Sequence, residues 1–422
     1  MLNSFAPPFK IVCGYFIFGF LFLFFAPLIL WQSYFSDIFI FSPNSIGVVH
    51  FFLLGFVLNI IIGSLYQLTS VVLESKFGII KFAVFNQVIF NIALLLFCLS
   101  FFGADLEFSK IVDWSLKIGL NLIKFIPNFD LIWLFGGILF LSLFYFCVGF
   151  LLSFKGVKGF NFTKFTLLLA GIFLAFTILC GLFLTLILSG TNSDFIANLN
   201  FDLLFRYHIY FALGALYFVI LASSCVLLPM FSLSHNLKFI LAKFGIGFYI
   251  LGGIFINFHA IFALLAVLCF CFQALYILFK RARKAYDYWN LNIFWAIFCL
   301  ILVCGYCVKF ALLWDYDFEI FLNLVGFGFF YPFIVAHAYK ILAFLVWYHY
   351  ISPFAGKMKV PLLTEMVNSK LAYTSLVLNI FGVIFGCFGW KNLAFLSLEI
   401  SVILFLINVF NILKFIKFKG NL

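Results

Sequence analysis

The stretch that decides the fold is Gly47–Leu73, GVVHFFLLGFVLNIIIGSLYQLTSVVL. It holds no charged residue, one histidine near its start, and a Gly-Ser-x-Tyr-Gln cluster near its end. At about 1.5 Å of rise per residue, a helix of this length crosses a hydrocarbon core of about 30 Å. The stretch therefore predicts a transmembrane helix, and its histidine is either an interfacial side chain or a ligand.

The same apolar character extends along the whole chain of 422 residues, of which 67% are hydrophobic and 9% are charged. Soluble domains average about 45–50% and 25% in these classes. We therefore expect an all-α polytopic membrane protein that forms a single transmembrane domain over residues 1–422. Apolar runs predict about twelve spans, at 11–32, 47–73, 78–102, 131–154, 163–189, 203–231, 238–256, 258–280, 290–314, 318–347, 370–390 and 392–416. The polar interval 103–130 predicts an interfacial helix.

The basic residues orient these spans. The net charge is +11, but the Lys and Arg residues lie mainly in short loops between apolar runs, which argues against a nucleic-acid partner. With the N-terminus inside, 19 of the 25 basic residues fall on the inner side and six on the outer side. This asymmetry predicts a multi-pass membrane protein with both termini cytoplasmic, and the lipid bilayer as its first partner.

Three spans share a weak repeat. The second carries GSLYQLTSV (Gly63–Val71), the sixth ASSCVLLPM (Ala222–Met230) and the tenth AHAYKILAF (Ala336–Phe344). Related helices at every fourth position predict three four-helix units.

Histidines are the main candidates for chemistry. On the predicted topology, His50, His208 and His259 lie at the outer ends of even-numbered spans. Imidazole is a common ligand of haem iron and of copper, and two imidazoles on one iron must bring their nitrogen atoms within about 4 Å. His50 and His208 therefore predict a haem or copper site, with His259 as a further candidate. The alternative is that all three are ordinary interfacial side chains.

A second group of polar residues lies toward the inner side. His337 is an ionisable residue inside a span, which is costly unless it has a function. With Tyr339 and Lys340, and with Tyr66 and Gln67 of the second span, it could line an inner cavity or pathway. A third alternative is a structural subunit without a site. The sequence assigns no catalytic residue, and whether the protein is an enzyme stays open.

Three segments resemble a divergent bacterial branch of the haem-copper oxidase subunit I superfamily, a neighbour of the NnrS-type haem and copper membrane proteins. They are HFFLLGFVLNIIIGSLYQL (His50–Leu68), LLPMFSLSH (Leu227–His235) and AHAYKILAFLVWYHYISPFAGKMKVPLL (Ala336–Leu363). The resemblance implies a twelve-helix bundle. It matches His50 to a haem ligand and His208 to a copper ligand. It also implies a bacterial cytoplasmic (inner) membrane location and a role in respiration or nitric oxide response, with respiratory-chain or assembly proteins as partners.

The sequence departs from that family at several ligand positions. The tenth span has the single histidine His337 where oxidases have a His-x-His pair. The seventh span, with LAKFGIGFYILGG at Leu241–Gly253, has no histidine. The Arg pair that holds haem propionates is missing, which leaves Arg206 and Lys391 as candidates. We therefore expect a haem- or copper-binding membrane protein with a redox, sensing or cofactor-handling role and no intact oxygen-reducing centre. The alternative is a small-molecule or ion transporter or channel that uses spans two, six and ten.

Overall fold

The computed structural model describes residues 5–33, 42–104, 129–190, 198–282, 284–313 and 317–418. These residues form helices and connecting loops, with one isolated bridge between Ala355 and Met358 and no strand among them. Eleven helical segments in the described ranges are long and apolar enough to cross a membrane, and a shorter apolar helix follows the sixth. The predicted fold class, an all-α polytopic membrane protein, is confirmed.

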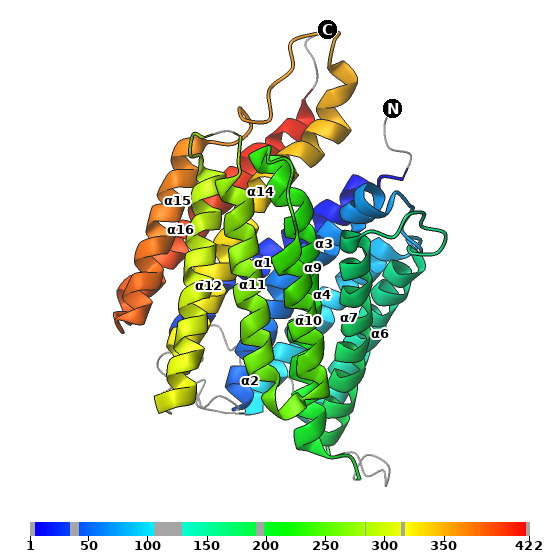
Figure 1. Cartoon of the computed structure of the whole chain (residues 1–422), viewed down its shortest axis with the longest axis vertical. Coiled ribbons are helices and arrows are strands. Elements are labelled where there is room, and N and C mark those ends of the chain that lie inside the picture. Colours follow the sequence, from blue (N-terminus) through cyan, green and yellow to red (C-terminus); the bar gives the residue numbers. More distant parts are fainter. Residues whose placement is uncertain are drawn as a thin grey trace, which may run out of the picture. The chain divides into compact units, whose positions relative to one another are not determined.

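The α-helices carry the labels of Figure 1. In chain order they are α1 (Phe9–Ser33), α2 (Pro43–His50), α3 (Asn59–Leu68), α4 (Ala83–Ala104), α6 (Ile132–Leu152), α7 (Phe162–Leu188), α9 (Phe201–Ser232), α10 (Ile240–Ile254), α11 (His259–Phe279), α12 (Tyr288–Leu313), α13 (Phe318–Asn323), α14 (Tyr331–Val346), α15 (Ser369–Cys387) and α16 (Lys391–Leu413). Short 3-10 turns occupy Phe129–Leu131, Ile256–Phe258, Ser352–Phe354 and Lys414–Lys417.

Contacts divide the chain into two compact units. The first comprises Met1–Phe18 and Phe41–Lys284, and the second comprises Gly19–Ile40 and Ala285–Leu422. The predicted arrangement in three four-helix units stays a prediction.

The second and tenth spans are not uniform α-helices. In the second span, α2 passes into a π-helix at Phe51–Leu58, then α3, then a second π-helix at Thr69–Leu73. The tenth span repeats this order, with π-helices at Leu324–Phe330 and Trp347–Ile351 on either side of α14. Since π-helices are rare and are found frequently at functional sites, the shared pattern adds a backbone resemblance to the weak sequence repeat of these two spans.

In the first unit, α7 packs along α9, and α10 packs along α11 (Figure 1). A column of three stacked tyrosine rings ties α9 to α10, with centroids 5.3 Å apart for Tyr210 and Tyr249 and 5.2 Å apart for Tyr217 and Tyr249. The Tyr249 hydroxyl donates to the Tyr210 carbonyl at 2.8 Å, and the Tyr217 hydroxyl donates to the Ala266 carbonyl of α11 at 3.1 Å. These bonds satisfy hydroxyl and carbonyl groups that would find no hydrogen-bond partner among lipid tails.

In the second unit, α15 and α16 lie side by side (Figure 1). A Cβ atom added at Gly382 would lie 2.7 Å from Leu398 of α16, so the close approach of the two helices depends on the small residue. On the same pair of helices, the Tyr331 hydroxyl of α14 meets the Ser375 and Ser401 hydroxyls at 3.2 and 3.0 Å. A buried hydroxyl cluster thus joins three helices.

Most span boundaries lie close to their predicted positions, but the third span begins at Ala83 instead of residue 78. The reason is that the backbone N–H of Gly78 bonds outside its own segment, to the Gly149 carbonyl at 3.1 Å and to Ser153 Oγ at 3.0 Å. The seventh span contracts to the 15 residues of α10. Most of the predicted interfacial helix, residues 105–128, lies outside the described residues.

Candidate functional site

The caps of two helices place His50 and His208 at the same depth. Ser42 Oγ accepts from the backbone N–H of Ser45 at 3.2 Å and starts the second span, with Pro43 in its first position. Asn200 Oδ1 accepts from the backbone N–H of Leu203 at 3.0 Å and starts the sixth span. Such side-chain acceptors are favoured caps because they satisfy the first free N–H groups of a helix. Each histidine is therefore the eighth residue of its span.

The structure places these two histidines side by side. The ring centroids of His50 and His208 are 6.4 Å apart, and the ring planes differ by 11°. The Nδ1 atom of His50 lies 2.8 Å from the Ile46 carbonyl oxygen, one turn back in α2. The Nδ1 atom of His208 lies 3.1 Å from the Thr177 carbonyl oxygen of α7. Both rings are thus oriented by backbone carbonyls.

These two hydrogen bonds determine which nitrogen of each ring can bind a ligand. A carbonyl oxygen can only accept, so Nδ1 carries the hydrogen in both rings and Nε2 keeps its lone pair. Metal-binding histidines usually donate their other ring N–H to a carbonyl or carboxylate, which holds the ring in place. Each ring therefore has one nitrogen bonded to a carbonyl and one nitrogen with a lone pair, as a metal-binding histidine has.

A metal bound by both Nε2 atoms would require a similar separation of the rings. Metal–nitrogen bonds of about 2.0–2.1 Å, with each nitrogen about 1.1 Å from its ring centroid, put two opposed imidazole centroids roughly 6.3 Å apart. Among the described residues there is no group of three or more His, Cys, Asp or Glu side chains that could hold a metal. Two protein ligands suffice for haem iron, whose macrocycle supplies the other four, or for two-coordinate Cu(I). The residues present fit these two groups and not a site built from three or four side chains.

Aromatic side chains and one glycine form the surroundings of the pair. The His50 ring lies 5.5 Å from Phe97 and 6.2 Å from Phe101, both on α4. Gly181 of α7 lies against His208, where an added Cβ would be 3.2 Å from Cε1. Gly181 is also four residues after Thr177, so the carbonyl that orients His208 lies beside a bare Cα. The glycine therefore gives the ring access to its acceptor.

His259 and Arg206 lie elsewhere in the first unit. His259 begins α11 and its Nδ1 lies 2.7 Å from the Ile256 carbonyl oxygen. In the described part of the chain it does not join the histidine pair as a third ligand. Arg206 is exposed, two residues before His208 on α9.

His337 and its neighbours belong to the second unit. His337 is 7% exposed, and its Nδ1 lies 2.8 Å from the Phe333 carbonyl oxygen, with the Trp289 ring 6.2 Å away. Lys340 forms an ion pair with Asp287, with Nζ 3.2 Å from Oδ2. Tyr339 is buried, and its ring lies 5.3 Å from that of Tyr288.

Tyr66 and Gln67 belong to the first unit. Tyr66 is buried between the rings of Tyr15 and Phe77, at centroid distances of 5.8 and 4.1 Å. Gln67 is partly buried beside it on α3. The packing of Tyr66 is that of an aromatic core residue.

Several residues of the site have no signature in the sequence. The orienting carbonyls of Ile46 and Thr177 are backbone groups, and Phe97 and Phe101 are two of 70 phenylalanines. Gly181 could have been suspected, because a glycine inside an apolar span often marks a close approach.

Comparison with known proteins adds no relative: no family model matches the sequence, and no curated protein matches it.

Proposed function

We propose that the chain is an integral membrane protein that binds a haem or a copper ion between His50 and His208. The observation that carries this proposal is the geometry of the pair: parallel rings with centroids 6.4 Å apart, each anchored through Nδ1 to a backbone carbonyl. Interfacial histidines without a shared ligand have no reason to match in both depth and ring plane. The proposed role is redox, sensing or cofactor handling linked to respiration or nitric oxide response, in keeping with the resemblance to the haem-copper oxidase superfamily.

Within this proposal the chain's own residues have defined tasks. The two Nε2 atoms bind the metal, and the Ile46 and Thr177 carbonyls keep the rings from rotating. Phe97 and Phe101 shield the His50 side from water. When bound, the haem or copper ion would supply one-electron chemistry or reversible binding of a small ligand.

The proposal is tested by the absorption spectrum and metal content of the purified protein. We expect a Soret band with reduced-minus-oxidised features, or copper at one ion per chain. His50→Ala and His208→Ala should each lower occupancy at least about tenfold, because neither ligand set is complete without both imidazoles. His259→Ala is the matched control and should keep full occupancy. A native protein with neither chromophore nor stoichiometric metal would refute the proposal.

A transporter or channel is the second candidate, and the π-helical segments favour it. Such segments are frequent at functional sites, and the second and tenth spans each contain two of them. His337, Tyr339 and Lys340 would then act in the second unit, with Tyr66 and Gln67 in the first. Solute uptake by proteoliposomes that is lost in His337→Ala, from a preparation free of chromophore and metal, would favour this candidate.

A further inference from the structure

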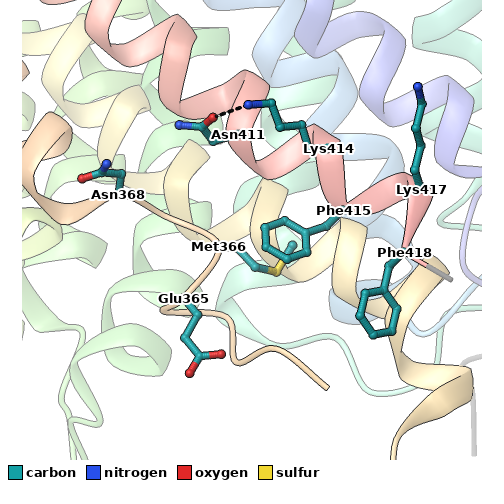
Figure 2. Close-up of a pocket in the computed structure, with 8 residues that line it drawn as sticks. All are labelled: Glu365, Met366, Asn368, Asn411, Lys414, Phe415, Lys417 and Phe418. Carbon is teal, nitrogen blue, oxygen red and sulfur yellow. Dashed lines mark hydrogen bonds between the residues drawn. The ribbon is translucent and has the colours of Figure 1, made fainter. Parts of the chain in front are cut away.

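A hollow of about 570 Å³ opens at the end of α16, far along the chain from the histidine pair. The last turn, Lys414–Lys417, forms one wall, and the segment Glu365–Asn368 ahead of α15 forms the other. Figure 2 shows the rings of Phe415 and Phe418 projecting from the first wall and Met366 projecting from the second. The volume lies within the range of about 300–1,000 Å³ that is typical of ligand sites.

The second wall is fastened to α16 by a reciprocal pair of hydrogen bonds. The Asn368 backbone N–H donates to Asn408 Oδ1 at 2.9 Å, and Asn408 Nδ2 donates to the Asn368 carbonyl at 2.9 Å. Asn408 is fully buried, and the Asn368 side chain also caps α15. The hollow is therefore preformed by the fold.

Its lining combines cationic and apolar groups. Lys414 and Lys417 are exposed at its rim. Lys414 Nζ donates to Asn411 Oδ1 at 3.1 Å and lies 5.2 Å from the centroid of the Phe410 ring. These two contacts hold its ammonium group beside Asn411, which also lines the hollow. Glu365 is the acidic residue of the lining, and its Oε2 already accepts from the Leu362 backbone N–H at 2.9 Å. With two lysines and one glutamate, the lining carries a net formal charge of +1.

We propose that this hollow binds the headgroup of an anionic phospholipid. The span that ends at Lys417 places the hollow at the boundary between hydrocarbon and water, where lipid phosphates lie. Lys414 and Lys417 would contact the phosphate oxygens, while Phe415 and Phe418 would contact the glycerol and the start of the lipid tails. A free phosphate ion would use the lysines but would gain nothing from the apolar lining.

The test uses the full-length protein in nanodiscs of phosphatidylcholine, with and without phosphatidylglycerol. Native mass spectrometry after release from the discs measures which lipid stays bound. We expect the native chain to retain phosphatidylglycerol. Because each lysine near a lipid phosphate contributes roughly fivefold in affinity, Lys414→Gln/Lys417→Gln should retain it roughly 30-fold less well. Lys414→Arg/Lys417→Arg keeps both charges and should bind as the native chain does.

Lys155→Gln/Lys158→Gln is the matched control, since it also removes two exposed lysines, from a turn of the first unit. It should retain phosphatidylglycerol fully. Equal melting temperatures in pure phosphatidylcholine discs establish that all variants are folded. Equal loss of lipid from both Gln pairs, or displacement of the lipid by millimolar inorganic phosphate, would overturn the proposal.

Discussion

At the scale of single residues, the position of the His208 ring depends on Gly181, which has no side chain. Gly181 leaves room for the imidazole and exposes the Thr177 carbonyl that orients it. A methyl group there would lie 3.2 Å from Cε1 and 3.6 Å from Nδ1 of His208, so the ring would have to shift. The cost of the substitution should therefore fall on ligand binding more than on folding.

We expect Gly181→Ala to weaken retention of the haem or copper by about tenfold, which is typical when the group that orients a metal ligand is disturbed. Gly137→Ala is the control, because an added Cβ there meets nothing within 4 Å. The measurement is occupancy after dialysis against a chelator or apomyoglobin. Equal occupancy in the two variants would show that the His208–Thr177 bond has no part in holding the ligand.

At the scale of helices, a buried amide pair joins the second span to α4. Asn59 Nδ2 donates to Asn91 Oδ1 at 2.8 Å, and Asn91 Nδ2 donates back to Asn59 Oδ1 at 3.2 Å. Asn59 Nδ2 also lies 2.7 Å from the Gly55 carbonyl, inside the π-helical segment. The pair therefore supports both the packing of two helices and the altered turn between His50 and α3.

Replacing Asn91 by Leu should destabilise the protein by about 1–2 kcal/mol, since it leaves the Asn59 amide without its partner on α4 in an apolar interior. The double variant Asn59→Leu/Asn91→Leu should cost less than the sum of the two single changes, because it removes both amides together. Unfolding measured by steric trapping or in mixed detergent gives these free energies. Additive costs would mean that the two amides act independently.

The sequence predicts helices better than it predicts their internal geometry. Long apolar runs such as Phe162–Leu188 have no competing explanation, so their bounds lie within a residue of the prediction. The π-helical turn at Phe51–Leu58 leaves no trace in hydropathy, because it changes hydrogen-bond register and not composition. His50 and His208 could be paired from their matching positions, whereas the Thr177 carbonyl that orients His208 comes within reach only when α7 packs against α9.

At the scale of the whole molecule, the basic residues predict on which side of the membrane each terminus lies. The 19-to-six distribution of Lys and Arg favours both termini on the cytoplasmic side. A fluorescent protein fused after Leu422 should therefore fluoresce, and alkaline phosphatase at the same point should be inactive. The reverse result would mean either an odd number of spans or an inverted topology, and only the inverted topology would move His50 and His208 to the other face.

The shortness of α10 has a consequence for the surrounding bilayer. At about 1.5 Å per residue, its 15 residues span only about 22 Å of a hydrocarbon layer about 30 Å thick. Phe244 and Ile254, which are 59% and 69% exposed, face outward from this helix. Hydrophobic mismatch of this size is relieved by local thinning of the membrane, at a modest cost for each ångström. Lipids with short acyl chains should therefore gather beside α10. Thick bilayers rich in sterol should lower the stability of the first unit.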